Sequence, residues 1–198
     1  MPLDFCRLLQ SRTIYQRRHE KNCANKINLS HTPLLDVGAS LCPGLVTMHI
    51  VHSCNCVGLE ENVMTFQGAE LLQAHVMKEK KLLNRPFIPI NGNAHDLKNF
   101  GGARIVYMWI KGAYVTLEDD MIELFCKDEH AMYLVTHVTT VDNRQLNTLR
   151  HVAEFKGKFA SSENSMNIHI YAKDKINMSN DHIKEVNGEE LSDRIAKG

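Results

Sequence analysis

Two histidines and two cysteines lie within eight residues in the segment that reads MHIVHSCNC. Both residue types are common ligands of Zn²⁺, and a structural zinc site needs four such donors converging at about 2.0–2.3 Å. The alternation of residues over 45–57 predicts a β-strand, on which His49 faces away from the other three. We therefore expect a buried strand, because Cys packs in cores as a small hydrophobe. A partial metal site formed by His52, Cys54 and Cys56 is the alternative.

The segment VTHVTTV contains a second candidate, the pair His137-x-Thr139. Paired H-x-T/S elements on strands are the signature of two-histidine phosphoesterases, in which imidazoles act as general acid and base and hydroxyls hold the phosphate. A second copy would come from His52 or His169, and neither has Thr or Ser two positions later. A small phosphoesterase that uses His137 and Thr139 is therefore the alternative function. The chain contains no P-loop, GxGxxG, GxSxG or HExxH motif.

The elements that would position these residues form one α+β domain, with a mainly antiparallel sheet and two principal helices packed on one side of it. The strand at 45–57 is followed by a helical period over 65–83 and by a loop rich in Pro and Gly over 84–102. A β-meander then contains the strands ARIVYMWI, AYVTL, MIELFCK and AMYLVTHVTTV. A helix over 142–155 and a last strand over 166–172 complete the predicted domain.

Charge divides the chain into three parts, although its net charge is zero. Residues 1–44 are predicted to be a basic, largely flexible arm, residues 45–172 the folded domain, and residues 173–198 a charged, weakly helical tail. A basic arm on a neutral body favours contact with phosphate-rich partners, either nucleic acid or an anionic membrane surface. The arm residues expected to make this contact are Arg7, Arg12, Arg17, Arg18, Lys21 and Lys26.

The order of these elements resembles the matrix proteins of rhabdoviruses over roughly residues 45–172. The strand LVTMHIV leads through a turn to the helix FQGAELLQAHV, and the late segment MYLVTHVTTVDNRQLNTLRHVAEF joins a strand, an acidic turn and a second helix. The single positions that carry the resemblance are Thr47, Phe66, Leu134, Thr136, Thr139, Asp142 and Phe155. The chain departs from the animal-virus members in lacking PPxY and PTAP-type motifs.

The resemblance implies a non-enzymatic structural protein that self-associates and bridges viral ribonucleoprotein to the inner face of a membrane. Apolar residues in a breaker-rich loop suit burial by a neighbouring subunit, and here they are Pro86, Phe87, Ile88, Pro89 and Ile90. The resemblance implies no cofactor and no small-molecule substrate. It places the protein in the virion beneath the envelope and in the host cytoplasm or at the inner membrane face, with the nucleus as a further location.

Overall fold

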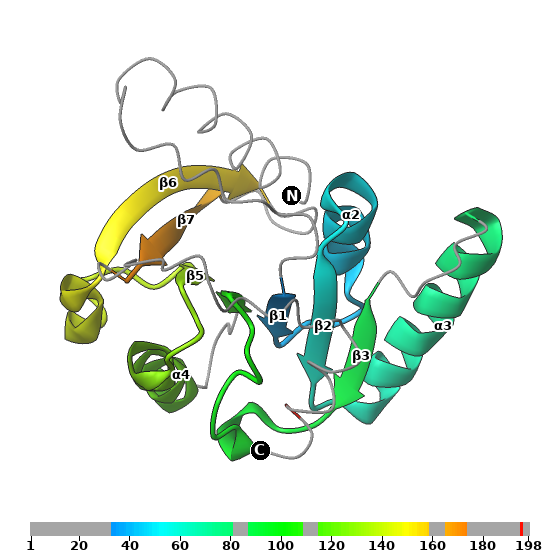
Figure 1. Ribbon diagram of the computed structural model, residues 1–198, viewed down its shortest axis with the longest axis horizontal. Helices are drawn as coiled ribbons and strands as arrows, with labels where there is room; N and C mark the ends of the chain where they lie inside the picture. The colour runs from blue at the N-terminus through cyan, green and yellow to red at the C-terminus, as the bar shows by residue number, and fades with distance from the viewer. Residues whose placement is uncertain (1–32, 81–86, 109–114, 159–164, 174–194, 196–198) are drawn as a thin grey trace, which may run out of the picture.

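A seven-stranded sheet forms the centre of the computed structural model, which describes residues 33–80, 87–108, 115–158, 165–173 and 195 (Figure 1). The strands are β1 (Pro33–Val37), β2 (Asn55–Glu60), β3 (Ile88–Asn91), β4 (Ile105–Met108), β5 (Tyr133–Thr136), β6 (Arg150–Lys158) and β7 (Ser165–Ala172). Their spatial order is β3-β2-β1-β4-β5-β7-β6. Strands β1 to β5 are parallel, and β7 lies antiparallel between β5 and β6.

Helices pack on both faces of this sheet (Figure 1). The described helices are α2 (Pro43–His52), α3 (Val63–Lys80), α4 (Val115–Lys127) and the 3-10 helices η1 (Ala94–Asp96) and η2 (Arg144–Thr148). Helices α2 and α3 share a core with Leu34 and Cys56, whereas α4, η1 and η2 share the opposite core with Leu35 and Val57. Because a parallel strand is buried on both sides, all five residues of β1 are buried. In the described part of the chain no helix combines the length and apolarity that a membrane span requires.

The prediction of a mainly antiparallel sheet is wrong, and the segment 45–57 explains much of the error. It forms most of α2 and the beginning of β2, with His52 as the last residue of the helix. A proline in the first turn favours helix initiation, and the left-handed residues Cys42 and Ser53 bound the helix. Leu45 and Met48 are buried at a spacing of three residues, which fits one face of a helix and not one face of a strand.

Five other predicted segments also differ from the structure. The predicted strands AYVTL and MIELFCK both contribute to α4, whose buried residues Leu117, Met121, Ile122 and Phe125 follow a helical period. The predicted helix over 142–155 is replaced by η2 and the first part of β6. Strand β3 lies inside the predicted loop, and β1 lies inside the segment predicted to be the arm. The helix predicted at 65–83 is confirmed over 65–80, where α3 is described.

Candidate functional site

The carboxyl ends of the parallel strands meet at one edge of the sheet, and the strand order reverses there. The chain proceeds from β1 towards β2 and β3 on one side, and from β4 towards β5 on the other. In open α/β sheets, ligands bind outside the carboxyl ends of the strands at such a switch point. We call residues 36–42, 58–62 and 91–96 the β1–β3 edge, because they lie at the ends of these three strands.

The loop that follows β1 has a constrained backbone. Gly38, Ser40 and Cys42 have positive φ angles of 76°, 53° and 58°. A left-handed conformation is free of cost only for Gly and costs roughly 1–2 kcal/mol for other residues. The backbone N–H groups of Gly38 and Ala39 both donate to the Leu59 carbonyl, at 2.9 and 3.0 Å. The end of β2 therefore holds the loop in place immediately before α2.

Glu60, the last residue of β2, joins this loop to the next one. Its Oε2 accepts the backbone N–H of Ser40 at 2.9 Å, and its Oε1 accepts that of Asn62 at 2.8 Å. An ionised carboxylate can accept about four hydrogen bonds, so both oxygens keep capacity for a ligand. In nucleotide-binding βαβ units, an acidic residue about 20 residues after the glycine turn binds ribose hydroxyls, and Glu60 stands at this spacing from Gly38.

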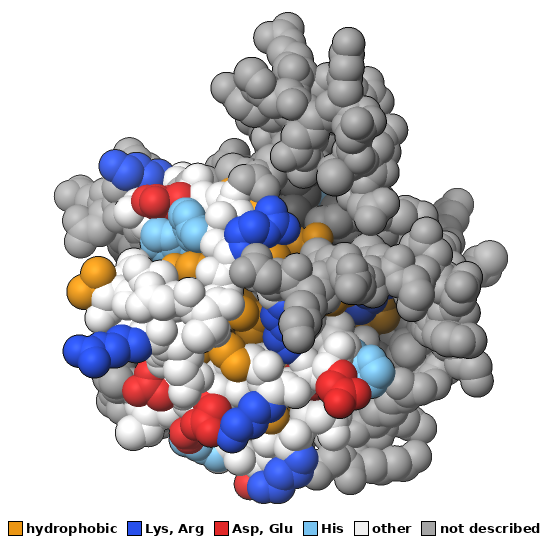
Figure 2. Space-filling view, turned by 60° about the vertical axis from the view of Figure 1, so that its left-hand side comes forward, with side chains coloured by type: hydrophobic (Ala, Val, Ile, Leu, Met, Phe, Trp, Pro, Cys, Tyr) orange, Lys and Arg blue, Asp and Glu red, His pale blue; other side chains and the backbone are white. Residues whose placement is uncertain are grey.

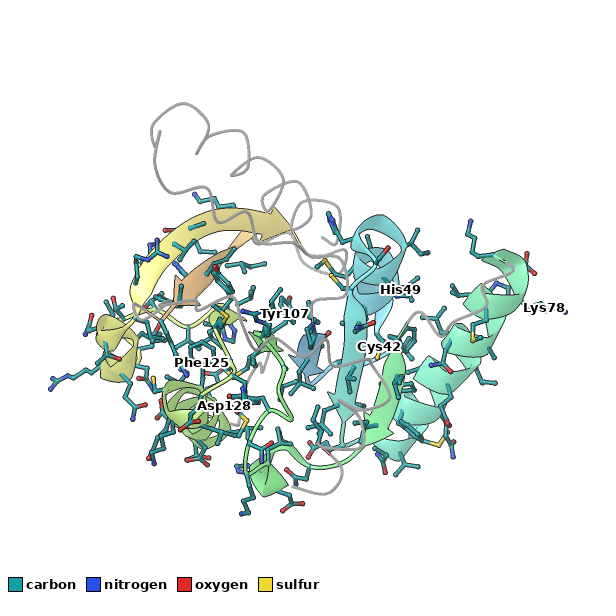
Figure 3. The ribbon with its side chains drawn as sticks, in the orientation of Figure 1. Cys42, His49, Lys78, Tyr107, Phe125 and Asp128 are labelled. Carbon is teal, nitrogen blue, oxygen red and sulfur yellow. The ribbon has the colours of Figure 1, made fainter. Side chains whose placement is uncertain are left out.

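Asp36 is a buried carboxyl group next to this loop, with only 8% of its surface exposed. Its Oδ1 has no hydrogen-bond partner among the described residues. Burial, and then the charge of Glu60, raise the pKa of Asp36 to about 8, so this carboxyl is mostly protonated at neutral pH. The side chain of Cys42 is labelled in Figure 3. Burial, and then the charges of Asp36 and Glu60, raise the pKa of its thiol, so it stays protonated and is no nucleophile. Tyr107 pairs in register with Asp36 from β4.

The β1–β3 edge is acidic. Residues 33–62 and 88–97 contain no Lys or Arg, although they contain Asp36, Glu60, Glu61 and Asp96. The side-chain amide of Asn91 donates to the carbonyls of Glu60 and Glu61, at 2.9 and 3.2 Å, and so ties the end of β3 to that of β2. A pyrophosphate would meet like charges here, whereas a neutral or cationic ligand would not.

His137 and Thr139 lie beyond the end of β5, where carboxylates surround them. The Nε2 of His137 lies 3.1 Å from a carboxylate oxygen of Glu118. The hydroxyl and the N–H of Thr139 donate to Asp142, at 2.6 and 3.0 Å, and these two bonds lower the pKa of Asp142. The charges of Asp119 and Asp142 add to burial in raising the pKa of Glu118. A phosphate group held by His137 and Thr139 would therefore face repulsion from two carboxyl groups.

The structure distributes the remaining predicted site residues over different elements. His52 ends α2, where burial lowers its pKa, while Cys54 precedes β2 and Cys56 lies within it. The buried thiol of Cys56 donates to the Cys54 carbonyl at 3.6 Å. Phe87 is buried in the core beneath α2 and α3, and residues 88–90 pair with β2 as part of β3. Pro86 and the six basic residues of the predicted arm lie outside the described residues.

Sequence reasoning missed Asp36, Gly38 and Glu60. The signal was present in LLDVGAS, an apolar run that ends in Asp, a hydrophobic residue and Gly, with Glu60 about 20 residues later. It was overlooked because a single glycine does not form GxGxxG and because the segment was assigned to the arm.

No family model matches this chain, and no curated protein matches it in sequence. Solved structures match its fold. A candidate tRNA (m1A22) methyltransferase of Streptococcus pneumoniae is 16% identical, with a TM-score of 0.56 over 74% of this chain and 66% of that one. M. capricolum TrmK, solved with S-adenosyl-homocysteine, is 11% identical, with a TM-score of 0.52 over 83% and 68%. Precorrin-6y C5,15-methyltransferase from Geobacter metallireducens is 13% identical, with a TM-score of 0.50 over 73% and 81%. The chain thus covers about two thirds of the length of the first two structures.

These findings correct the resemblance to rhabdovirus matrix proteins. The chain has the Rossmann-like fold of these methyltransferase structures, with a mostly parallel sheet. The prediction of a non-enzymatic viral matrix protein is therefore wrong, and the predicted ribonucleoprotein and membrane partners and self-association lose their basis. The phosphoesterase alternative is wrong as well, since the fold differs and carboxylates surround His137 and Thr139. The expectation of no small-molecule substrate falls with the matrix-protein resemblance that implied it.

Proposed function

We propose that this chain is a methyltransferase that uses S-adenosylmethionine and binds it at the β1–β3 edge. The observation that carries the proposal is Glu60, whose carboxylate hydrogen-bonds the loop after β1 at the switch point of the sheet. The match to M. capricolum TrmK, solved with S-adenosyl-homocysteine, supports this choice of ligand.

The residues at this edge fit an S-adenosyl nucleoside. Glu60 would accept the ribose hydroxyls with the lone pairs that its two backbone contacts leave free. Helix α2 begins directly after the loop, and its positive end suits the carboxylate of the amino-acid part. The unpartnered Oδ1 of Asp36 is a buried polar atom that a ligand group could satisfy.

The charge of the β1–β3 edge favours S-adenosylmethionine over a dinucleotide, a ligand that the same fold class often binds. A dinucleotide brings a pyrophosphate, and the acidic β1–β3 edge offers it no described Lys or Arg. S-adenosylmethionine carries a positively charged sulfonium, which supplies an electrophilic methyl group when the ligand is bound. The carboxylate of Glu60 and the field of the neighbouring acids favour that positive charge.

The proposal is tested by calorimetric titration of the purified full chain with S-adenosyl-homocysteine and, in parallel, with NAD⁺. We expect binding of S-adenosyl-homocysteine and none of NAD⁺ at the same concentrations. Glu60→Gln should weaken binding at least about 10-fold, because a ribose hydroxyl loses a charged acceptor. Glu70→Gln is the matched control, since its exposed side chain lies on α3, outside the β1–β3 edge, and should leave the affinity unchanged.

Three results would count against the proposal. They are failure to bind S-adenosyl-homocysteine at millimolar concentration, tighter binding of NAD⁺, or equal effects of the two substitutions. A thermal melt of each variant shows whether a loss of binding reflects unfolding.

A further inference from the structure

Strands β6 and β7 bring three side chains with metal-ligating groups together. His151 and Glu154 belong to β6, and His169 belongs to β7. Residues three apart on a regular strand face opposite sides. The register of β6 shifts between His151 and Ala153, so that His151 lies opposite Tyr171 and Glu154 lies opposite His169. This β-bulge therefore turns all three side chains to one face of the hairpin.

The distances between their donor atoms suit a common ion. The Nε2 of His151 lies 3.2 Å from the Nδ1 of His169, and the Oε2 of Glu154 lies 4.0 Å from that same Nδ1. All three donor atoms lie within 4.8 Å of one another. Ligand atoms of a tetrahedral ion with bonds of about 2.0–2.1 Å are separated by roughly 3.3–3.4 Å. The two nitrogens are thus already spaced as neighbouring ligands, and the exposed Glu154 can rotate towards them.

Packing fixes the two imidazoles in this orientation. The Nε2 of His169 is buried and has no hydrogen-bond partner among the described residues, so the ring presents Nδ1 to the cluster. The buried ring of Tyr171 lies 5.3 Å from that of His151 and 6.1 Å from that of His169, centre to centre. The Tyr171 hydroxyl donates to the Val138 carbonyl at 3.3 Å, which anchors the ring.

The exposure of the three side chains and the types of their donor atoms indicate which metal ions could bind. His151 and Glu154 are exposed, so an ion can reach the cluster from solvent. On the face that Figure 2 brings forward, histidine side chains lie beside acidic ones at the surface. Two imidazoles and one carboxylate suit Zn²⁺ and similar transition metals better than Mg²⁺ or Ca²⁺, which prefer oxygen ligands alone.

We propose that His151, Glu154 and His169 form a binding site for a divalent transition metal ion of the zinc class, with at least one coordination position open to water or to another ligand. The site joins β6, the strand at one end of the sheet, to its neighbour β7, and His169 lies opposite Thr136 at the end of β5. It does not depend on the proposed methyltransferase function.

The test uses the full chain without a histidine tag, reduced and freed of metal with a chelator. Zn²⁺ is titrated calorimetrically, and Co²⁺ then serves as a spectroscopic probe. We expect one ion per chain, a visible Co²⁺ spectrum without a thiolate charge-transfer band, and a higher Tm with the metal. His151→Ala and Glu154→Gln should each weaken binding at least about 10-fold. Both side chains are exposed, so both variants should fold.

His75→Ala is the matched control, because His75 is an exposed histidine on α3, outside the cluster. Its affinity for Zn²⁺ should equal that of the unchanged protein. Absence of binding would mean that the two imidazoles are a hydrogen-bonded pair only, and the proposal would be wrong. Binding with a thiolate band would place the ion at cysteines, and binding unaffected by His151→Ala would place it outside the cluster. Either result would equally overturn the proposal.

Discussion

The strand ends on the two sides of the switch point are built differently. At the β1–β3 edge, Asp36 is buried, Glu60 is held by two backbone N–H groups, and the loop has three residues with positive φ. We call residues 136–143, with Glu118, Asp119, His151, Glu154 and His169, the β5–β7 edge. There the polar groups pair mostly with one another, as in the bonds from Thr139 to Asp142 and from Asn143 to Asp119.

This difference indicates that the β1–β3 edge suits recognition of a ligand, whereas the β5–β7 edge suits exchange of polar partners. Close packing and a constrained backbone preorganise the β1–β3 edge, which suits recognition of one ligand geometry. The histidine–carboxylate pairs at the β5–β7 edge are partly exposed, so they can exchange a partner for an ion or water. Substitutions that disturb packing at the first edge should therefore cost more stability than substitutions that remove a polar contact at the second.

The largest effect is expected at Gly58, in the middle of β2. A Cβ atom there would lie 2.6 Å from the Cys42 sulfur and 2.8 Å from the Ala39 Cβ, both in the loop that follows β1. We expect Gly58→Ala to lower the free energy of unfolding by about 1–3 kcal/mol, because a packed core resists an added methyl group. Chemical denaturation measures this loss.

The matched control for Gly58 is Gly44, in the first turn of α2. Beyond its chain neighbours and the backbone of its own helix, no atom lies within 4 Å of a Cβ added at Gly44. Gly44→Ala should therefore stabilise the protein by about 0.4–1 kcal/mol, through the unfolded state. If both substitutions had the same small effect, the β1–β3 edge would not be closely packed, and the comparison would fail.

A second effect concerns Asp36 and depends on pH. The pKa of Asp36 is raised from 3.8 to about 8 on folding, so its protonated form stabilises the fold at low pH, and this stabilisation is lost as the pH rises through about 8. Asp36→Asn keeps a neutral side chain at all pH values. We expect it to raise the free energy of unfolding at pH 8 by about 1–3 kcal/mol and to change it little at pH 4.

Denaturation at a series of pH values from 4 to 8 tests this expectation for Asp36. The exposed Asp96, also at the β1–β3 edge, provides the control Asp96→Asn, which should leave the pH profile unchanged. A parallel loss of stability with pH in Asp36→Asn and in the unchanged protein would show that another group is responsible.

Local patterns in the sequence predicted some elements correctly and failed where two periods coincide. Helix α3 was predicted from a weak helical period before a breaker-rich loop, and strand β7 from a short alternating run. The segment 45–57 was misassigned because buried residues such as Leu45 and Met48 satisfy a helical period within an alternating sequence. Parallel pairing adds to the difficulty, because each strand of β1–β5 pairs with partners that are distant in sequence.

The two candidate sites were hidden from sequence reasoning for different reasons. The loop after β1 uses Ser40 and Cys42 at left-handed positions, where glycine would have been the expected signal. At β6, His151 and Glu154 are three apart, a spacing that separates them on a regular strand. Only the bulge brings them to one face, and nothing in the local sequence predicts it.

At the β5–β7 edge, we expect a smaller loss from Asn143→Ala. The buried Asn143 accepts the Gln145 N–H at 2.8 Å, which caps η2, and donates to Asp119 on α4. Loss of such a cap and one hydrogen bond costs about 1 kcal/mol. The exposed Asn147 in η2 provides the control Asn147→Ala, which should be nearly neutral. A loss larger than that of Gly58→Ala, measured by denaturation, would contradict the ranking of the two edges.

The smallest effect is expected for Thr139→Ala. The Thr139 hydroxyl is the main cause of the lowered pKa of Asp142, so its removal should raise that pKa towards the usual 3.8, while the bond from the backbone N–H remains. A lowered pKa stabilises the fold above pH 4, and this stabilisation is lost as the pH falls through the pKa of the folded protein. Because Asp142 is exposed, screening by solvent should limit the loss at pH 7 to less than about 0.5 kcal/mol. A carboxyl titration by NMR measures the pKa directly, and an unchanged value in the variant would mean that the backbone alone holds Asp142 ionised.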